Sequence, residues 1–535
     1  MPDNPRFSLV LGFATETGNS TMVAKRFAQA AAAAGIDVEP QYLNDLNLDT
    51  LASVTHFVVI TATYGDGEVP YDAEVFWEEL SAESSRRLDH LTYAVLGLGD
   101  SFYPLFCNAG KIIDARLEEL GARRLAERVD CDLEFEEPAE AWTSHVVRLL
   151  AEASPPTTSA PAPEGVAGPP VAVWTRTNPY PAQLVAAHRL TGPASDKTVC
   201  HYEIDLAGSG IAYQAGDSVG VHPVNDPALV AAILGRLGVG FDHRVVGREH
   251  PLGTLLTEHL EIRIPTAALR QLVAAHTRDT AAAAILSGGD PVALSRWAHG
   301  RDVLDLLTLA DLGVDDVVAT LRPLQHRDYS IASSPLVHPR CIHLTVAAVE
   351  YRARGRSHRG VASGFLAQRG RDVRIHLVPN DSFRLPAADV PIVMVGPGTG
   401  IAPFRAFLQE RQATAAAGRS WLFFGARRRT TDFLYGDELI SLHRAGVLTR
   451  LNCAFSREGF AKDYVQHHMS AHAGELYGWL QDGAYFYVCG DEHMARDVHR
   501  ALHEVVRTAG RCSDDDAHAY VNDLITTHRY LRDVY

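Results

Sequence analysis

The sequence lacks several features that would place it in a special class of protein. No run of about 20 apolar residues occurs, so no membrane-spanning helix is expected. Residues 1–6 are too polar to begin a signal peptide. The seven cysteines are scattered and never spaced as CxxC, which argues against disulfides, structural zinc and an iron–sulfur cluster. We therefore expect a cytoplasmic protein with no metal site.

Positive charge is scarce in the first part of the chain. Residues 1–150 hold 25 acidic and 11 basic side chains, which gives −14 of the total net charge of −16. This excess either serves solubility alone or forms an acidic docking face for a basic partner, since complementary charge raises encounter rates. Nucleic-acid binding is not expected from this sign of charge.

The patterns of strands and helices divide the 535 residues into three α/β or β parts joined by one linker. Residues 1–150 alternate apolar strands with amphipathic helices, which predicts a doubly wound sheet. Residues 151–170 are rich in Pro, Ala and Thr and predict a flexible linker. Residues 171–388 predict a β-barrel with a helical insertion at about 226–318. Strand–helix alternation over 389–535 predicts a second doubly wound domain.

Three loops in the first part follow successive predicted strands and suit the parts of FMN. The Thr15–Ser20 loop joins a strand to a helix, so its hydroxyl and N–H groups can bind a phosphate monoester. Tyr64 and Tyr103 lie in the other two loops and could enclose a flat isoalloxazine ring. A plain glycine-containing turn is the alternative for any one loop, whereas the three together predict an FMN site.

The Arg327–Ser330 segment suits a second flavin, FAD. Arginine can bind a diphosphate with two parallel hydrogen bonds. Tyr329 can stack on the flavin ring, and the Ser330 hydroxyl can hydrogen-bond its N5 atom. An Arg-x-Tyr-Ser string by itself occurs by chance in β-strands. Here the segments that follow it, up to Gly360–Ser363, also suit FAD and so strengthen the prediction.

The last part of the chain carries signals for a nicotinamide nucleotide. Gly396–Gly400 lies between an apolar strand and a helix, where glycines permit close approach to a pyrophosphate. Ser456, Arg457 and the 462–464 segment would match the 2′-phosphate of NADPH, with a solvated charged turn as the alternative. Cys489 ends a further strand, which favours contact with the nicotinamide over an inert buried thiol.

Taken in order, these segments resemble the diflavin reductase family, in which a flavodoxin-like domain is joined to a ferredoxin–NADP reductase module. The resemblance covers essentially the whole chain and is strongest with the flavoprotein subunits of bacterial sulfite reductases. It rests on Leu98–Cys107, Arg128–Asp130, Asn380–Pro386, Gly396–Phe407, Ser456–Arg457, Lys462–Gln466 and Arg529–Tyr535.

The resemblance implies a set of residues for each cofactor. It places FMN at Thr15, Glu16, Thr17, Gly18, Asn19, Ser20, Ala62, Thr63, Tyr64, Gly65, Leu98, Gly99, Asp100, Ser101, Phe102, Tyr103, Pro104, Leu105, Phe106 and Cys107. It places FAD at Thr257, Arg327, Asp328, Tyr329, Ser330, Thr345, Val346, Ala347, Tyr351, Gly360, Val361, Ala362 and Ser363. With Gly398 and Thr399 of the glycine-rich segment, NADPH is expected at Ser456, Arg457, Lys462, Asp463, Tyr464, Val465, Gln466 and Asp497.

The resemblance also implies a reaction. Tyr535 would cover the FAD ring and move aside for nicotinamide, while Ser330, Cys489 and Asp533 would orient it during hydride transfer. Electrons would then pass from FAD to FMN and on to a separate haem protein, with the sirohaem/iron–sulfur subunit of sulfite reductase as the expected acceptor. A haem-thiolate monooxygenase or a nitrite or nitrate reductase is an alternative acceptor. A flavin-binding sensor or scaffold that does not turn over is an alternative of another class.

Overall fold

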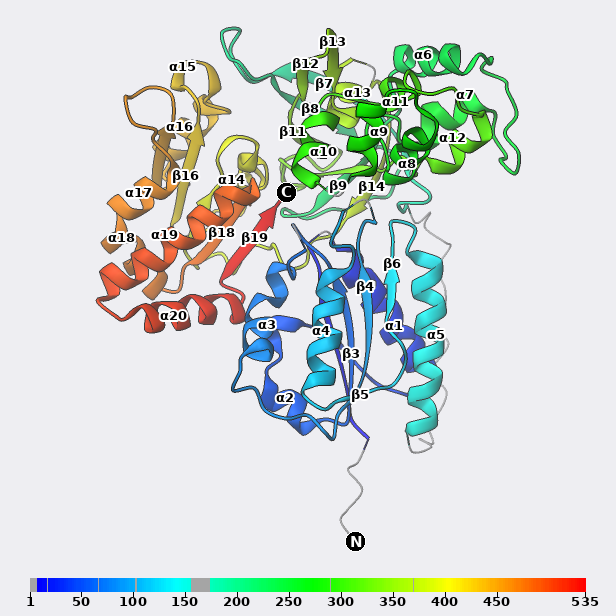
Figure 1. Ribbon diagram of the computed structural model, residues 1–535. Helices are drawn as coiled ribbons and strands as arrows, with labels where there is room; N and C mark the ends of the chain where they lie inside the picture. The colour runs from blue at the N-terminus through cyan, green and yellow to red at the C-terminus, as the bar shows by residue number, and fades with distance from the viewer. Residues whose placement is uncertain are drawn as a thin grey trace.

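The structure is a computed structural model, and it describes residues 7–16, 18–65, 67–101, 103–154, 174–288, 290–368 and 370–535. Three lobes are visible in Figure 1. We call them the N-terminal domain (7–154), the middle domain (174–388) and the C-terminal domain (389–535). Most of the predicted linker, together with Thr17 and Phe102, lies outside the described residues.

The N-terminal domain is a parallel sheet with helices on both faces. Its strand order is β2-β1-β3-β4-β5, with β6 also paired to β4. The strands are β1 (Leu9–Ala14), β2 (Pro40–Tyr42), β3 (His56–Ala62), β4 (Thr92–Leu98), β5 (Arg123–Arg124) and β6 (Val129–Cys131). The helices are α1 (Asn19–Ala33), α2 (Leu48–Ser53), α3 (Glu74–Ser81), α4 (Asn108–Glu119) and α5 (Glu136–Ala153), with short turns η1 (Leu43–Asp45) and η2 (Tyr71–Ala73). Helices α1 and α5 pack on one face and α3 and α4 on the other, so β3 and β4 are apolar on both sides.

The middle domain is built on a six-stranded antiparallel sheet of order β10-β9-β14-β7-β8-β11. Its strands, with those of the separate β12–β13 hairpin, are β7 (Tyr180–Arg189), β8 (Val199–Asp205), β9 (Ser218–His222), β10 (Arg327–Ser330), β11 (Cys341–Ala347), β12 (Glu350–Ala353), β13 (Arg356–Arg359) and β14 (Asp372–Val378). Helix α13 (Val361–Gln368) follows the hairpin.

The predicted insertion is helical and has an apolar core of its own. Its helices are α6 (Pro227–Leu237), α7 (Leu252–Thr254), η3 (Leu255–His259), α8 (Ala267–His276), α9 (Thr280–Ser287), α10 (Pro291–Ala298), α11 (Val303–Leu307) and α12 (Val314–Thr320). Asp226 caps α6 by accepting a hydrogen bond from the Ala228 N–H group, and Gly238 ends it in the left-handed conformation.

The C-terminal domain is a second parallel sheet, of order β17-β16-β15-β18-β19. Its strands are β15 (Ile392–Val395), β16 (Ser420–Ala426), β17 (Arg450–Phe455), β18 (Tyr485–Gly490) and β19 (Tyr530–Val534). Its helices are η4 (Gly398–Gly400), α14 (Ile401–Ala413), α15 (Arg429–Asp432), α16 (Gly436–Arg444), α17 (Val465–Ala471), α18 (Ala473–Gln481), α19 (Glu492–Gly510) and α20 (Asp514–Thr526). Helices α14 and α16 cover one face of the sheet, and α17 to α20 cover the other.

The N-terminal domain packs against both other domains. The Tyr71 hydroxyl donates a hydrogen bond of 3.0 Å to the Tyr530 carbonyl oxygen in β19. The guanidinium group of Arg532 lies 4.3 Å from the centre of the Tyr71 ring. On the middle domain, Arg322 pairs with Asp100 at 3.0 Å. Figure 1 shows the resulting arrangement, with the N-terminal domain below the other two.

In the parts of the chain that the structure describes, no helix is both long enough and apolar enough to cross a membrane.

Candidate flavin and nucleotide sites

One cleft lies where the three domains meet. The N-terminal domain contributes the predicted phosphate loop, and the other two domains contribute β10 and the end of β19. The predicted site residues that line it are Thr15, Glu16, Gly18, Asp328, Ser330, Asp533 and Tyr535. The structure therefore brings the expected FMN phosphate loop and the expected FAD ring site to the same cavity, which we call the flavin cleft.

The phosphate loop has the local geometry that a phosphate group needs. Gly18 has a φ of +81°, and its N–H donates to the Thr15 hydroxyl oxygen at 2.9 Å. Ser20 lies in the first turn of α1 and is fully buried, yet within the described residues its hydroxyl has no hydrogen-bond partner. A buried hydroxyl without a partner is costly unless a ligand satisfies it. The loop thus fits the terminal phosphate of FMN.

Two carboxyl groups close the back of this loop. Asp72 accepts the Thr15 N–H at 3.0 Å, and Glu16 accepts the Tyr71 N–H at 2.8 Å. Burial raises the pKa of Glu16 to about 7 and also raises the pKa of Asp72. The loop therefore carries less negative charge near neutral pH than its sequence suggests, which favours an anionic ligand. Sequence reasoning did not predict a role for either Tyr71 or Asp72.

The other two predicted FMN loops are placed differently from each other. Tyr103 is 56% exposed. Tyr64 is partly buried, and its ring packs against the core of the C-terminal domain. Asp100 forms the interdomain ion pair with Arg322, and Cys107 is buried in the left-handed conformation at the start of α4. Enclosure of a flavin ring by Tyr64 and Tyr103 stays a prediction.

The three residues expected to act on the nicotinamide lie together, because Ser330 and Cys489 both contact the carboxyl group of Asp533. The Ser330 hydroxyl donates a hydrogen bond of 2.5 Å to Asp533, and the Cys489 sulfur lies 3.6 Å from the same oxygen. The pairing of β18 with β19 sets Cys489 directly opposite Asp533. Burial raises the pKa values of both the Asp533 carboxyl and the Cys489 thiol. The Cys489 thiol is therefore neutral, and the Asp533 carboxyl group holds a proton more tightly than usual.

Tyr535 lies on the boundary between the flavin cleft and a second cavity. Its side chain is 61% exposed, and its hydroxyl is 2.7 Å from the hydroxyl of Thr399. Its N–H donates to the Gly490 carbonyl oxygen at 3.1 Å. A side chain at Gly400 would lie 2.1 Å from the Cys489 carbonyl oxygen, so only glycine fits where this loop crosses β18.

The remaining predicted FAD residues lie along β10, β11 and α13. The Arg327 guanidinium donates to the carbonyl oxygens of Gln325 and His326, both at 3.0 Å, so it lies against its own loop. Thr345 is 2.7 Å from the Tyr435 hydroxyl. The Ser363 hydroxyl accepts the Val349 N–H at 3.1 Å.

The predicted FAD residues Tyr351 and Thr257 lie further from the flavin cleft. Tyr351 stacks on His358 in the β12–β13 hairpin, with ring centres 5.2 Å apart. The Thr257 hydroxyl donates to the Gly253 carbonyl oxygen at 2.7 Å. Neither residue lines the flavin cleft. Gly360 and Val361 border a separate cavity beside the insertion.

The second cavity lies at the carboxyl edge of the C-terminal sheet. We call it the nucleotide cleft. The predicted residues that line it are Gly398, Thr399, Ser456, Asp463, Tyr464, Val465, Gln466, Asp497 and Tyr535. Arg457 and Lys462 do not line it.

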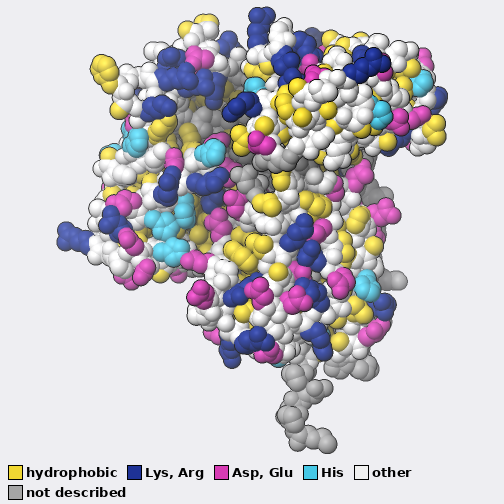
Figure 2. Space-filling view, viewed as in Figure 1, with side chains coloured by type: hydrophobic (Ala, Val, Ile, Leu, Met, Phe, Trp, Pro, Cys, Tyr) yellow, Lys and Arg dark blue, Asp and Glu magenta, His cyan; other side chains and the backbone are white. Residues whose placement is uncertain are grey.

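A group of arginines lies next to the nucleotide cleft. Arg457 is ion-paired with Asp196 of the middle domain, which also lies 3.4 Å from Arg427 and 3.2 Å from Arg428. Figure 2 shows Lys and Arg side chains gathered on this part of the surface, at the upper left. Sequence reasoning missed Arg427, which lines the cleft, although the run of three arginines directly after β16 was a usable signal.

Comparisons with known families agree with the three domains. The family described as Flavodoxin matches residues 11–142, the FAD binding domain family matches residues 173–365, and the Oxidoreductase NAD-binding domain family matches residues 394–500. A flavodoxin domain that shares one cleft with an FAD domain, beside a nucleotide domain, defines an NADPH-dependent diflavin oxidoreductase with FMN, FAD and NADPH as cofactors.

Full-length relatives identify the family within that class. A protein of Bacillus subtilis is 40% identical over 98% of this chain and 88% of its own length. One of Neisseria meningitidis is 41% identical over 100% and 91%, and one of Vibrio cholerae is 42% identical over 98% and 87%. All three are named sulfite reductase (NADPH) flavoprotein alpha-component. The chain belongs to this family.

Proposed function

We propose that this chain passes electrons from NADPH, through FAD and FMN, to a separate haem protein that reduces sulfite to sulfide. The observation that carries the proposal is the flavin cleft, where Gly18 of the phosphate loop and Ser330 with Asp533 line one cavity. When bound, the two flavins supply hydride acceptance and one-electron transfer. One-electron transfer between the two flavins requires that they lie close together.

The residues of the chain position the reacting groups. Tyr535 borders both clefts, and its hydrogen bonds within the described residues are the backbone contact to Gly490 and the hydroxyl contact to Thr399, so its ring can move aside. Ser330 can then hydrogen-bond the flavin while Asp533 holds the serine and the Cys489 thiol in place. In this proposal Asp533 orients these two groups and balances the positive charge that develops on the nicotinamide.

The acceptor is proposed from the names of the relatives and from charge. Those relatives are named as the flavoprotein component of sulfite reductase, and a reductase of sulfite needs a haem component that no cysteine cluster of this sequence could hold. The acidic N-terminal domain would dock the sirohaem/iron–sulfur subunit. All seven cysteines are free thiols, which agrees with a reducing cytoplasm.

The test is steady-state NADPH oxidation by the flavin-loaded chain, first with cytochrome c and then with a sirohaem sulfite reductase subunit and sulfite. Cytochrome c reduction and sulfide formation are both expected. Cytochrome c reduction without sulfide would overturn the proposed acceptor and direct the search to monooxygenases and nitrite or nitrate reductases. Absence of both activities would leave the sensor or scaffold alternative.

A pair of variants tests the assigned roles. Asp533→Asn should slow NADPH oxidation, because the amide oxygen can still accept from Ser330 but the side chain has no negative charge to balance the charge on the nicotinamide. Asp482→Asn removes a surface carboxylate that pairs with Arg419 at 2.7 Å and should leave the rate unchanged. Equal rates for the two variants would argue against the role of Asp533.

A further inference from the structure

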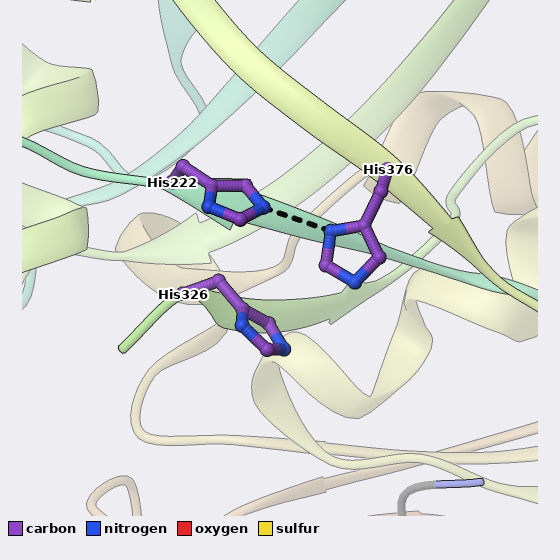
Figure 3. Close-up of side chains that lie close together, drawn as sticks. All are labelled: His222, His326 and His376. Atoms are coloured by element: carbon purple, nitrogen blue, oxygen red, sulfur yellow. Dashed lines mark hydrogen bonds between the residues drawn. The ribbon is translucent and has the colours of Figure 1, made fainter. Parts of the chain in front are cut away.

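Three histidines from three neighbouring strands of the middle domain lie against one another. His222 ends β9, His376 lies in β14, and His326 directly precedes β10. These strands are adjacent in the sheet, and His376 is paired with Gly220 while His222 is paired with Arg374. Figure 3 shows the three rings pointing toward a common centre.

The rings are close enough to share a ligand. One ring nitrogen from each histidine lies within 4.8 Å of the other two. The His222 Nε2 and His376 Nδ1 atoms are 3.0 Å apart, and the ring centres of His326 and His376 are 4.7 Å apart. Tetrahedral zinc with Zn–N bonds of about 2.0–2.1 Å separates its nitrogens by about 3.3 Å. Small side-chain rotations would therefore complete the geometry.

The local sequence makes room for this arrangement. A side chain at Gly220 would lie 2.1 Å from the His376 ring, so the glycine opposite His376 lets the imidazole lie across β9. His376 is 6% exposed, whereas the side chain of His326 is 17% exposed. The cluster is thus largely buried, and His326 is more exposed than His376.

The rings of His222 and His376 are joined by a hydrogen bond of 3.0 Å between Nε2 and Nδ1, as Figure 3 shows, and a bound ion would take the place of this hydrogen bond. The Asp328 carboxylate, 3.4 Å from His326 Nε2, can orient that ring as carboxylates do beside metal-bound histidines.

The charges around the cluster are mostly paired. Arg176 is near enough to act electrostatically on all three rings, and its guanidinium is ion-paired with Glu136 of α5. Arg374 lies 3.4 Å from Glu258, and Arg327 lies 3.9 Å from Glu261. These pairings reduce the repulsion that the arginines would exert on a cation.

We propose that His222, His326 and His376 form a binding site for one divalent transition-metal ion such as Zn²⁺, with water in the remaining coordination position. Three imidazoles plus one open position is a known arrangement for zinc. The ion would connect β9, β10 and β14, the strands that carry Ser218, Ser330 and Val378 to the flavin cleft. The spacing of the cysteines argued against a zinc site built from cysteines, but it does not bear on a site built from histidines.

A second cluster on the same domain does not meet these conditions. His201, Glu203 and His343 also lie close together. However, Nη1 of Arg405 donates to His343 Nδ1 at 3.3 Å, so this ring nitrogen is already occupied. Because that nitrogen of His343 accepts from arginine, its other nitrogen carries the proton. His338, whose ring lies beside that of His343, provides the control.

The test is zinc titration, by isothermal calorimetry, of the chain loaded with FMN and FAD and freed of metals by a chelator. One zinc ion per chain is expected, and X-ray absorption should show nitrogen neighbours at about 2.0–2.1 Å. His326→Gln and His222→Gln should each weaken binding by about 100-fold or more, since loss of even an outer-shell partner costs about 10- to 100-fold. His338→Gln, whose ring centre lies 4.1 Å from that of His343 in the second cluster, should bind zinc as the parent does.

Zinc should also raise the thermal midpoint of the parent chain but not that of His326→Gln. Far-UV circular dichroism of the two histidine variants checks that they remain folded. The proposal is overturned if the parent binds no zinc, if His326→Gln and His222→Gln bind it as tightly as the parent, or if zinc binds only after FAD has been removed.

Discussion

Replacement of Arg532 by methionine should release the N-terminal domain from the C-terminal domain. Arg532 is in β19, and its side chain is only 6% exposed. Its guanidinium group lies 4.3 Å from the centre of the Tyr71 ring and 3.6 Å from the Glu74 carboxylate, both of which belong to the N-terminal domain. Methionine retains an unbranched apolar side chain but loses both interactions.

The expected loss follows from these two contacts. A desolvated cation–π interaction contributes about 2 kcal/mol. The ion pair with Glu74, whose side chain is 42% exposed, contributes at most about 1 kcal/mol after solvent screening. The docking free energy should therefore fall by about 2–3 kcal/mol, which lowers the ratio of docked to undocked molecules about 30- to 140-fold.

Two measurements report on docking. Small-angle X-ray scattering of the flavin-loaded chain should show a larger radius of gyration for Arg532→Met. Stopped-flow absorbance should show slower electron transfer from FAD to FMN. Arg419→Met is the control, because Arg419 also combines an ion pair, with Asp482 at 2.7 Å, and a ring contact, 4.4 Å from the Trp479 ring, but entirely within the C-terminal domain.

The control variant should match the parent in both measurements. If Arg532→Met also matches the parent in scattering and in interflavin rate, then Arg532 does not hold the domains together. If both arginine variants slow electron transfer equally, the effect is a general loss of stability in the C-terminal domain.

Three further predictions concern nucleotide choice and pH. Arg457→Ala should weaken NADP⁺ binding by about 1.5–3 kcal/mol, the scale of a charged hydrogen bond, and leave NAD⁺ binding unchanged in calorimetry; equal losses would refute contact with the 2′-phosphate. Tyr535→Ala should shift the kcat/KM preference toward NADH, because the ring that nicotinamide must displace is gone, and an unchanged preference would count against that role. The hydrogen bond to Asp45 raises the pKa of His528 across the interdomain contact, so this contact stabilises docking fully below about pH 6.5 and is lost as pH rises through the docked-state pKa. Scattering across that range should show opening with rising pH, and Asp45→Asn should remove this part of the change.

Local patterns predicted most of the fold and the centre of the candidate site. Phe57 to Ile60 in β3 are buried on both faces, and such a run of apolar residues is typical of a central parallel strand. Thr15 was predicted from loop chemistry and Ser330 from the Arg327–Ser330 segment, and the structure places both in the flavin cleft. These signals are short in sequence, so they can be found without knowledge of packing.

Contacts between domains could not be predicted in the same way. Tyr71 and Arg532 are more than four hundred residues apart, and neither belongs to a motif that names its partner. The periodicity of a strand indicates which face is buried but not which domain covers it. The histidine cluster was missed for a related reason, because only the pairing of β9, β10 and β14 brings His222, His326 and His376 together.

The side chains of the final strand, β19, point alternately to two sides and contact two different parts of the molecule. Tyr530 and Arg532 point toward the N-terminal domain, where both contact Tyr71, whereas Asp533 points the other way, to Ser330. Successive residues of a strand face opposite sides, so a shift of β19 by one residue would exchange the two sets. A single inserted residue just before Tyr530 would thus remove domain docking and the carboxyl group of the FAD site together. The register of β19 therefore sets both the docking of the N-terminal domain and the position of the Asp533 carboxyl group beside Ser330.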